Sequence, residues 1–266
     1  MLIKCNDSDI KKVINYIGED RTLCFYMYMD IIECGTEDEG LGLWISENND
    51  NIDMVCYIYF DCLHVFSRQG CVVSEVIKLI NDIDPKVIVG NENDISEIEK
   101  ELKENRYTYE LNHIITADII MHSEVNVDVQ LAKEDDIPEI ATLMMKDHIY
   151  YSVYSYDKLC DDLRRRFREG FGRLFVVRDS DNRIIATNAT NAETDDLAVI
   201  GGLVTDPDMR GRGLGRSITA STWNLIRREG KQGLAFLLSD NINTINLHKK
   251  MGFEFIGKSA RLVKND

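Results

Sequence analysis

Apolar positions recur along the chain with helical spacing in some segments and with the alternation of strands in others. In residues 1–122 the pattern predicts helices over 7–17, 24–34, 72–83 and 95–104, and strands over 41–46, 54–60, 62–67, 86–90 and 106–119. In residues 123–266 it predicts helices over 131–148, 157–168, 215–228 and 244–251, and strands over 127–131, 174–178, 183–193, 197–205, 233–239 and 254–263. Strands that alternate with helices predict an α/β (α+β) fold, a mixed sheet covered by helices.

Charge is divided unequally between the two halves. The formal net charge is −15, and residues 1–122 hold 10 Lys and Arg against 24 Asp and Glu. This asymmetry predicts an acidic domain over 1–122 and a second domain over 123–266, with a linker at 119–126. Phosphate groups would be repelled by the first half, so we expect no nucleic-acid binding there. The acidic surface either keeps the protein soluble or attracts a cationic amine or a basic partner.

Composition favours a soluble, cytoplasmic protein. Apolar residues make up 44% and charged residues 29% of the chain. There is no run of about 18 apolar residues, so no membrane span is expected. The N-terminal sequence MLIKCNDSDIKK is too polar for a signal peptide. The seven cysteines include no CxxC pair, which is typical of thiols in a reducing cytosol.

The most informative segment is VTDPDMRGRGLGRS, residues 204–217, which joins an apolar strand to a helical pattern. Glycines allow the backbone to turn tightly and bring its N–H groups close to an anion. A helix N-terminus adds unpaired N–H donors and partial positive charge, and three arginines add full charges. The segment therefore predicts a site for a phosphorylated cofactor. It is not a Walker loop, because no Gly-Lys-Ser/Thr closes it, and its Gly-x-Gly-x-Gly spacing is not the dinucleotide fingerprint.

Arg-Gly-x-Gly-x-Gly after a strand and a proline resembles the acyl-CoA loop of the GCN5-related N-acetyltransferase (GNAT) superfamily. A second segment, SDNINTINLHKKMGF at residues 239–253, is similar to the next motif of that superfamily. The resemblance covers roughly residues 126–266. Thr205 and Pro207, with two glycines before them, look most like the glycine N-acyltransferase-like (FR47-like) branch. The order of elements in the first half resembles a degenerate copy of the same fold. Its counterpart of the loop, Ser67 to Gly70, has one glycine, and we expect no cofactor there.

The resemblance implies acetyl-CoA as co-substrate, with no metal. The strand backbone at Leu203, Val204 and Thr205 would pair with the pantetheine amides, and Asn241 would contact the pantetheine arm. The diphosphate would lie on the loop, whose implied binding residues are Arg210, Gly211, Arg212, Gly213, Leu214, Gly215 and Arg216. No covalent enzyme intermediate is implied, so no cysteine need act as nucleophile.

His248 departs from the superfamily pattern, which usually has a tyrosine there to protonate the leaving thiolate. An imidazolium can also donate a proton, and its reference pKa of ~6.5 is nearer neutral pH than the ~10 of tyrosine. His248 is thus a candidate general acid; alternatively it packs, and water supplies the proton. Glu193 is a candidate base for the acceptor ammonium, and the alternative is a solvated carboxylate at a strand end.

Several residues are candidates for the acceptor site. Asn188, Thr190 and Asn191 alternate along one predicted strand and are candidates to line it. The aromatic loop from Tyr150 to Tyr156 either encloses a substrate amine or packs between the domains. The run RRRFR, residues 164–168, is a solvated helix face or a binding element for an acidic acceptor.

The sequence thus predicts an N-acetyltransferase that moves an acetyl group directly from acetyl-CoA to a small-molecule or peptide amine in a ternary complex. The alternative is a non-catalytic acyl-CoA sensor on the same fold. Neither the acceptor nor the oligomeric state is specified by the sequence.

Overall fold

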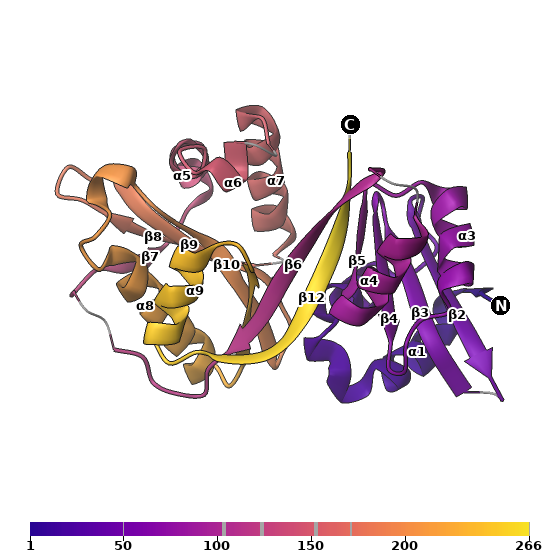
Figure 1. Cartoon of the computed structure of the whole chain (residues 1–266). Coiled ribbons are helices and arrows are strands. Elements are labelled where there is room, and N and C mark those ends of the chain that lie inside the picture. The colour runs from indigo at the N-terminus through magenta and orange to yellow at the C-terminus, as the bar shows by residue number, and fades with distance from the viewer. Residues whose placement is uncertain (50, 103–104, 123–124, 152–153, 171, 266) are drawn as a thin grey trace. The chain divides into compact units, whose positions relative to one another are not determined.

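The computed structural model describes residues 1–49, 51–102, 105–122, 125–151, 154–170 and 172–265, which form two compact units (Figure 1). The first unit comprises Met1–Ile114, Leu237–Ile242 and Phe255–Asp266, and the second comprises Ile115–Phe236 and Asn243–Glu254. Neither unit is continuous in sequence, unlike the predicted domains 1–122 and 123–266. Part of the expected linker, and residues 152 and 153 of the aromatic loop, lie outside the described residues.

The sheet of the first unit has the strand order β1-β2-β3-β4-β5-β12-β6. Its strands are β1 (Ile3–Cys5), β2 (Leu41–Asn48), β3 (Asn51–Tyr59), β4 (Cys62–Ser67), β5 (Val87–Asn91), β6 (Tyr107–Thr116) and β12 (Glu254–Lys264). Its helices are the 3-10 turns η1 (Asp7–Asp9) and η2 (Gly18–Thr22) and the α-helices α1 (Ile10–Ile17), α2 (Phe25–Cys34), α3 (Val73–Ile83) and α4 (Glu92–Glu101). Strand β4 runs parallel to β5, whereas β12 runs antiparallel to it.

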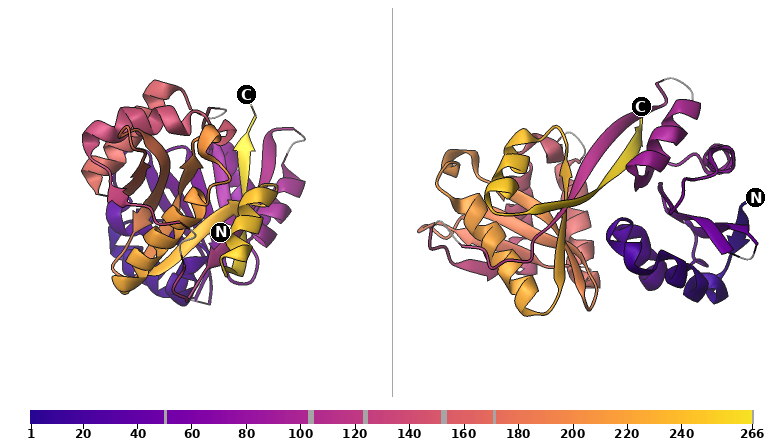
Figure 2. Two further views of the ribbon diagram at one scale, coloured as in Figure 1. Left: turned by 90° about the vertical axis from the view of Figure 1, so that its left-hand side faces the viewer. Right: turned by 60° about the horizontal axis from the view of Figure 1, so that its bottom comes forward.

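Alternation along β3 supplies apolar side chains to both faces of this sheet. Met54, Cys56 and Ile58 face the helices α3 and α4, and Val55 and Tyr57 face α1 and α2. The two helical layers of the first unit are visible on opposite sides of its strands (Figure 2). Burial on both faces explains why these strands read as nearly continuous apolar runs.

The sheet of the second unit has the strand order β11-β10-β9-β8-β7. Its strands are β7 (Val129–Leu131), β8 (Leu174–Arg178), β9 (Ile184–Glu193), β10 (Leu197–Thr205) and β11 (Gln232–Leu238). Its helices are η3 (Glu134–Asp136), α5 (Ile137–Met144), α6 (His148–Tyr151), α7 (Tyr156–Glu169), η4 (Pro207–Met209), α8 (Leu214–Arg228) and α9 (Ile242–Lys250). Helices α5 and α7 cover one face, around Val176 and Val204, and α8 covers the other, around Phe175 and Ile218.

Several elements differ from the sequence-based expectation. The helix expected over 131–148 is the turn η3 followed by the shorter α5, and the expected aromatic loop begins inside α6. The strand β1 was not expected, because three residues are too short to show alternation. Residues 254–263, expected as closing strands beside the second half, form the single strand β12, which pairs with β5 of the first unit. None of the helices in the described ranges has the length and apolar character of a membrane span.

Candidate functional site

Strands β10 and β11 pair only at their beginnings. The parallel ladder runs from Leu197↔Gln232 to Val199↔Leu234, yet β10 continues to Thr205 and β11 to Leu238. On its other edge β10 pairs with β9 and is interrupted by register shifts after Val199 and after Gly201. Beyond Val199 the two parallel strands therefore separate, and the β11-facing edge of β10 is not used by that ladder. An edge of β10 that β11 does not pair with is what the implied pairing of Leu203, Val204 and Thr205 with pantetheine amides requires.

The glycine loop leads directly from β10 into α8. The Asp206 carboxylate accepts a hydrogen bond from the Asp208 amide at 3.0 Å and caps the turn η4. Gly211 and Gly213 have φ of 74° and 78°, a region that other residues adopt at a cost. Gly213 is the N-cap of α8, and no side chain caps this helix. The first-turn amides of α8 are therefore available to an external acceptor.

Arg210 and Arg212 keep much of their hydrogen-bonding capacity. Arg210 donates from Nε to the Thr205 carbonyl at 3.2 Å and lies 3.5 Å from the Asp147 carboxylate. Arg212 donates to the Asp208 carbonyl at 3.4 Å, and Arg216 lies in the first turn of α8. An uncapped helix start, open glycines and three cations together fit a diphosphate. Asn241 lies in the turn between β11 and α9, and its contact with a pantetheine arm stays a prediction.

His248 is buried on α9. Its side chain packs edge-on against Phe253, with 4.8 Å between ring centroids, and Nδ1 lies 2.8 Å from the Thr244 carbonyl. Burial lowers the pKa of His248, and the Thr244 hydrogen bond opposes this only in part. A neutral imidazole whose Nδ1–H is donated to a carbonyl has no proton ready for a thiolate. These contacts favour the packing alternative over the general acid.

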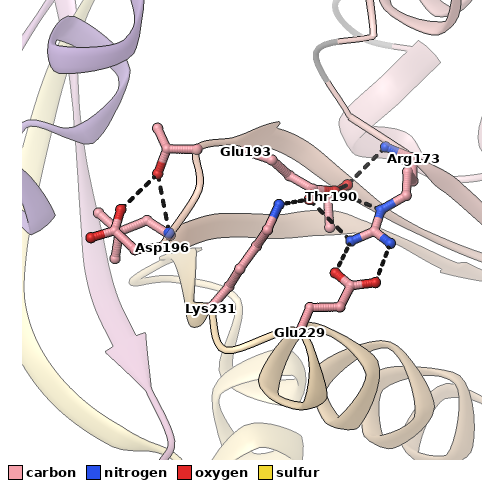
Figure 3. A network of polar contacts seen from close by, with 8 residues as sticks. Arg173, Thr190, Glu193, Asp196, Glu229 and Lys231 are labelled. Atoms are coloured by element: carbon pink, nitrogen blue, oxygen red, sulfur yellow. Dashed lines mark hydrogen bonds and ion pairs between the residues drawn. The ribbon is translucent and has the colours of Figure 1, made fainter.

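Glu193 is held in a network of cations (Figure 3). Arg173 donates to it from Nε and Nη2 at 2.8 and 3.0 Å, and Lys231 donates at 2.7 Å. Arg173 also pairs with Glu229, at 2.7 Å from Nη2. Burial raises the pKa of Glu193, but the hydrogen bonds from Arg173, Lys231 and Thr190 outweigh it and hold the pKa below its usual value. Its side chain is only 12% exposed, so it is not the solvated carboxylate of the alternative, and its ion pairs also disfavour a base role.

The candidate acceptor residues separate into two groups. Thr190 and Asn191 line a cavity in the second unit, together with Tyr150 and Tyr154 of the aromatic segment. Asn188 is buried elsewhere, is not part of that lining, and its Nδ2 has no hydrogen-bond partner among the described residues. Sequence reasoning missed Arg173, Lys231 and Glu229, because only the fold brings together these distant segments.

The counterpart loop in the first unit, Ser67 to Gly70, is occupied by a carboxylate of the chain itself. Asp94 is 1% exposed and accepts hydrogen bonds from the Ser67 hydroxyl at 2.7 Å, the Cys71 amide at 2.8 Å and Asn91 Nδ2 at 2.7 Å. A buried carboxylate at this place repels an incoming diphosphate and already binds one of the backbone amides that would hold it. This supports the prediction that the first unit holds no cofactor. In the described parts of the chain, no three His, Cys, Asp or Glu side chains are grouped to hold a metal ion.

Comparison with known proteins identifies part of the chain and its fold. Residues 177–262 match the family model described as FR47-like protein. No curated protein matches the chain.

Several solved structures share the fold over nearly the full length. A GCN5-related N-acetyltransferase from Sphaerobacter thermophilus has a TM-score of 0.67 at 10% identity, with 99% of this chain and 95% of that chain covered. An acetyltransferase of the GNAT family from Colwellia psychrerythraea has a TM-score of 0.62 at 11% identity, with 100% of both chains covered. A tandem GNAT protein from the clavulanic acid biosynthesis pathway has a TM-score of 0.60 at 9% identity, with 98% and 97% covered. The expected fold class is confirmed: a mixed α/β structure with duplicated GNAT-like domains.

Proposed function

We propose that the chain is an acetyl-CoA-dependent N-acyltransferase of the GCN5-related N-acetyltransferase superfamily, and the FR47-like match over residues 177–262 supports this. One observation carries the proposal: strand β10 separates from β11 and then turns through open glycines into the uncapped start of α8. The first feature provides backbone groups for the two pantetheine amides. The second provides N–H donors and positive charge for the diphosphate.

The proposed reaction is a direct transfer. The amine nitrogen attacks the thioester carbon, a C–N bond forms, the C–S bond breaks, and the thiolate takes up a proton. The chain would contribute mainly binding and orientation, which can supply a large part of the rate enhancement of such a reaction. Roles for His248 as acid and Glu193 as base remain hypotheses, and the contacts of both side chains weaken them.

The experiment that tests the proposal measures binding and turnover separately. Calorimetry with the full chain gives the affinity for acetyl-CoA, and a thiol-reactive chromophore detects free CoA in the presence of amines, amino acids or peptides. We expect binding and amine-dependent thiol release. Binding without thiol release for any acceptor would instead identify an acyl-CoA sensor. The histidine at position 248, where the superfamily usually has a tyrosine, suggests this alternative. Absence of binding would contradict both functions.

A further inference from the structure

The second unit contains a cavity of about 180 Å³ between helix α7 and strands β8, β9 and β10. Tyr150 of α6 lines it from the helical side, and Gly202 lines it from β10. Gly202 directly precedes Leu203, the first strand residue implied to hold pantetheine. The cavity therefore lies beside the part of β10 where the acyl group of acetyl-CoA would extend beyond the pantetheine arm and meet an acceptor.

The backbone of β10 leaves the regular sheet at Gly202. Its register with β9 is interrupted between Gly201 and Val204, so that ladder passes over Gly202 and Leu203. Its ladder with β11 has already ended at Val199. Gly202 has a φ of 68°, a conformation that glycine adopts without steric cost. A bulge of this kind changes the direction in which a strand presents its groups, and this one lies at the wall of the cavity.

The hydroxyl of Tyr150 lies next to this bulge. A Cβ on Gly202 would lie 4.0 Å from the Tyr150 hydroxyl oxygen, and the two atoms nearer to it, at 3.3 and 3.8 Å, belong to Ala189. Because residue 202 is a glycine, it has no side chain to separate the hydroxyl from the backbone. The Tyr150 ring packs against the apolar cluster of α5 and α7, so its apolar body is buried while its polar end reaches β10.

The turn that carries Tyr150 is tied to the cofactor loop. Lys146 donates to the Asp206 carboxylate at 2.7 Å, and the Asp147 carboxylate lies 3.5 Å from Arg210. Asp206 and Arg210 are the residues that flank the turn η4. The Tyr150 amide donates to the Asp147 carbonyl at 3.0 Å. These contacts connect Tyr150 to the loop proposed to bind the diphosphate, so a bound cofactor and the hydroxyl would keep a fixed relation.

A hydroxyl at this place suits the charge that develops during acyl transfer. Attack by an amine moves an electron pair onto the acyl oxygen, and hydrogen-bond donors aimed at that oxygen stabilise the transition state. A phenol is protonated at neutral pH and can donate one hydrogen bond. His248 is not available for this task, because it is buried and the Thr244 carbonyl engages its Nδ1 at 2.8 Å.

We propose that Tyr150 is a catalytic residue: its hydroxyl donates a hydrogen bond to the acyl oxygen of bound acetyl-CoA, and this bond strengthens as the amine attacks. The inference rests on the proposed function. When a neutral amine forms the C–N bond, the electron pair of the C=O bond moves onto the oxygen, and the phenol keeps its proton while it binds that oxygen. When the C–S bond breaks, the C=O bond forms again, and the thiolate takes up the proton that the nitrogen loses.

The first test is the rate of acyl transfer in a single turnover, measured as amine-dependent thiol release. Tyr150→Phe removes only the hydroxyl, and we expect this rate to fall roughly 10²–10³-fold, the usual loss for one oxyanion donor. The affinity for CoA, measured by calorimetry, should not change, because CoA has no acyl oxygen. A Tyr150→Phe variant that transfers the acyl group at the wild-type rate would overturn the inference.

Tyr151→Phe is the matched control. Tyr151 is the next residue of α6, is 57% exposed and is not among the residues that line the cavity. Its loss of a hydroxyl should leave both the rate and the affinity for CoA at the wild-type values. Equal losses of rate in Tyr150→Phe and Tyr151→Phe would overturn the assignment to Tyr150.

The second test is spectroscopic and needs no acceptor. The isotope-labelled thioester carbonyl of bound acetyl-CoA gives an infrared band whose frequency falls when the oxygen accepts a hydrogen bond. We expect this band at a higher frequency in Tyr150→Phe than in the wild type, and at the wild-type frequency in Tyr151→Phe. Equal frequencies in Tyr150→Phe and the wild type would overturn the contact. A wild-type band at the frequency of acetyl-CoA in an aprotic solvent would overturn it without any variant.

Together the two tests separate this inference from the proposed function. Thiol release that is slow only in Tyr150→Phe, with the expected infrared shift, would support both. Thiol release at the wild-type rate in Tyr150→Phe would overturn the inference and leave the acyltransferase intact. The expected infrared shift without thiol release for any amine would leave the contact of Tyr150 with the acyl oxygen standing and contradict the acyltransferase.

Discussion

The imidazole of His248 lies against the ring of Phe253, and its Nδ1 is engaged by the Thr244 carbonyl. His248→Phe keeps a ring of similar size there and removes the titratable nitrogens. We expect kcat of this variant within about threefold of the wild type, with an unchanged pH profile, because the buried imidazole is neutral. Steady-state thiol release over a range of pH checks this. A fall in kcat of roughly 10²–10⁴-fold, partly recovered in His248→Tyr, would instead establish His248 as the proton donor.

His64 on β4 makes the free energy of unfolding depend on pH. Burial lowers its pKa from 6.5 to about 4, although the Asp30 carboxylate lies 3.6 Å from Nε2. Between these values the unfolded chain binds a proton that the folded chain does not. His64 therefore lowers the free energy of unfolding as pH falls from 6.5 towards 4, by up to about 1.4 kcal/mol per pH unit, and has no such effect above neutral pH. Urea unfolding of wild type and His64→Gln from pH 7.5 to 5 measures this. A wild-type curve no steeper than that of the variant would contradict the assignment.

Single side chains also show which parts of the site could be predicted from the sequence and which could not. Sequence reasoning located the glycine loop because that motif is local. Of its three acceptor candidates, Thr190 and Asn191 line the cavity and Asn188 does not, and the register shift of β9 against β10 at Asn191 is not visible in the sequence. It selected Glu193 as a base without its ion pairs, since Arg173 and Lys231 lie 20 and 38 positions away in sequence. Partners that only the fold brings together decide whether a carboxylate is a base or an ion-pair member.

At the scale of elements, the glycine loop and α8 allow a matched pair of variants. Gly211 and Gly230 have φ of 74° and 80°, and an added Cβ at either would meet nothing within 4 Å. Valine should strain both positions equally, at roughly 1–2 kcal/mol, because β-carbons disfavour this conformation. Only Gly211 precedes the uncapped start of α8, so Gly211→Val should abolish CoA binding while Gly230→Val keeps it. Calorimetry on both variants, with circular dichroism as the check of folding, decides this. Equal CoA affinities would show that the loop does not hold the diphosphate.

The bounds of helices and strands were predicted best where a continuous apolar run ends at residues that interrupt regular secondary structure. The predicted bounds of β8 and β10 agree with the structure, and α8 begins one residue earlier than expected. Helix α5 is shorter than its pattern suggested, because the first turn after Lys133 is the 3-10 turn η3 and the helix ends at Met144. Strand β12 shows the limit of such patterns. Its apolar alternation indicates a strand but does not say which strand it pairs with.

At the scale of the whole molecule, the C-terminal strand belongs to the unit that holds the N-terminus. Strand β12 pairs with β5 from Ser259↔Asn91 to Val263↔Val87, and Leu262 is fully buried in the core beneath α3 and α4. The stability of the first unit should therefore depend on residues at the far end of the chain. Leu262→Ala removes buried methyl groups there and should cost about 2–5 kcal/mol, the usual range for such a change.

The matched control is Leu234→Ala on β11, an equally buried leucine in the second unit. Hydrogen exchange followed by mass spectrometry can report both units in one experiment. We expect Leu262→Ala to lower protection mainly in β4 and β5, and Leu234→Ala to lower it mainly in β9 and β10. A Leu262→Ala variant that loses protection in β9 and β10 as much as in β4 and β5 would contradict the division into two units. The expected patterns would show that a continuous N-terminal segment is not a complete folding unit, because its sheet includes the last strand of the chain.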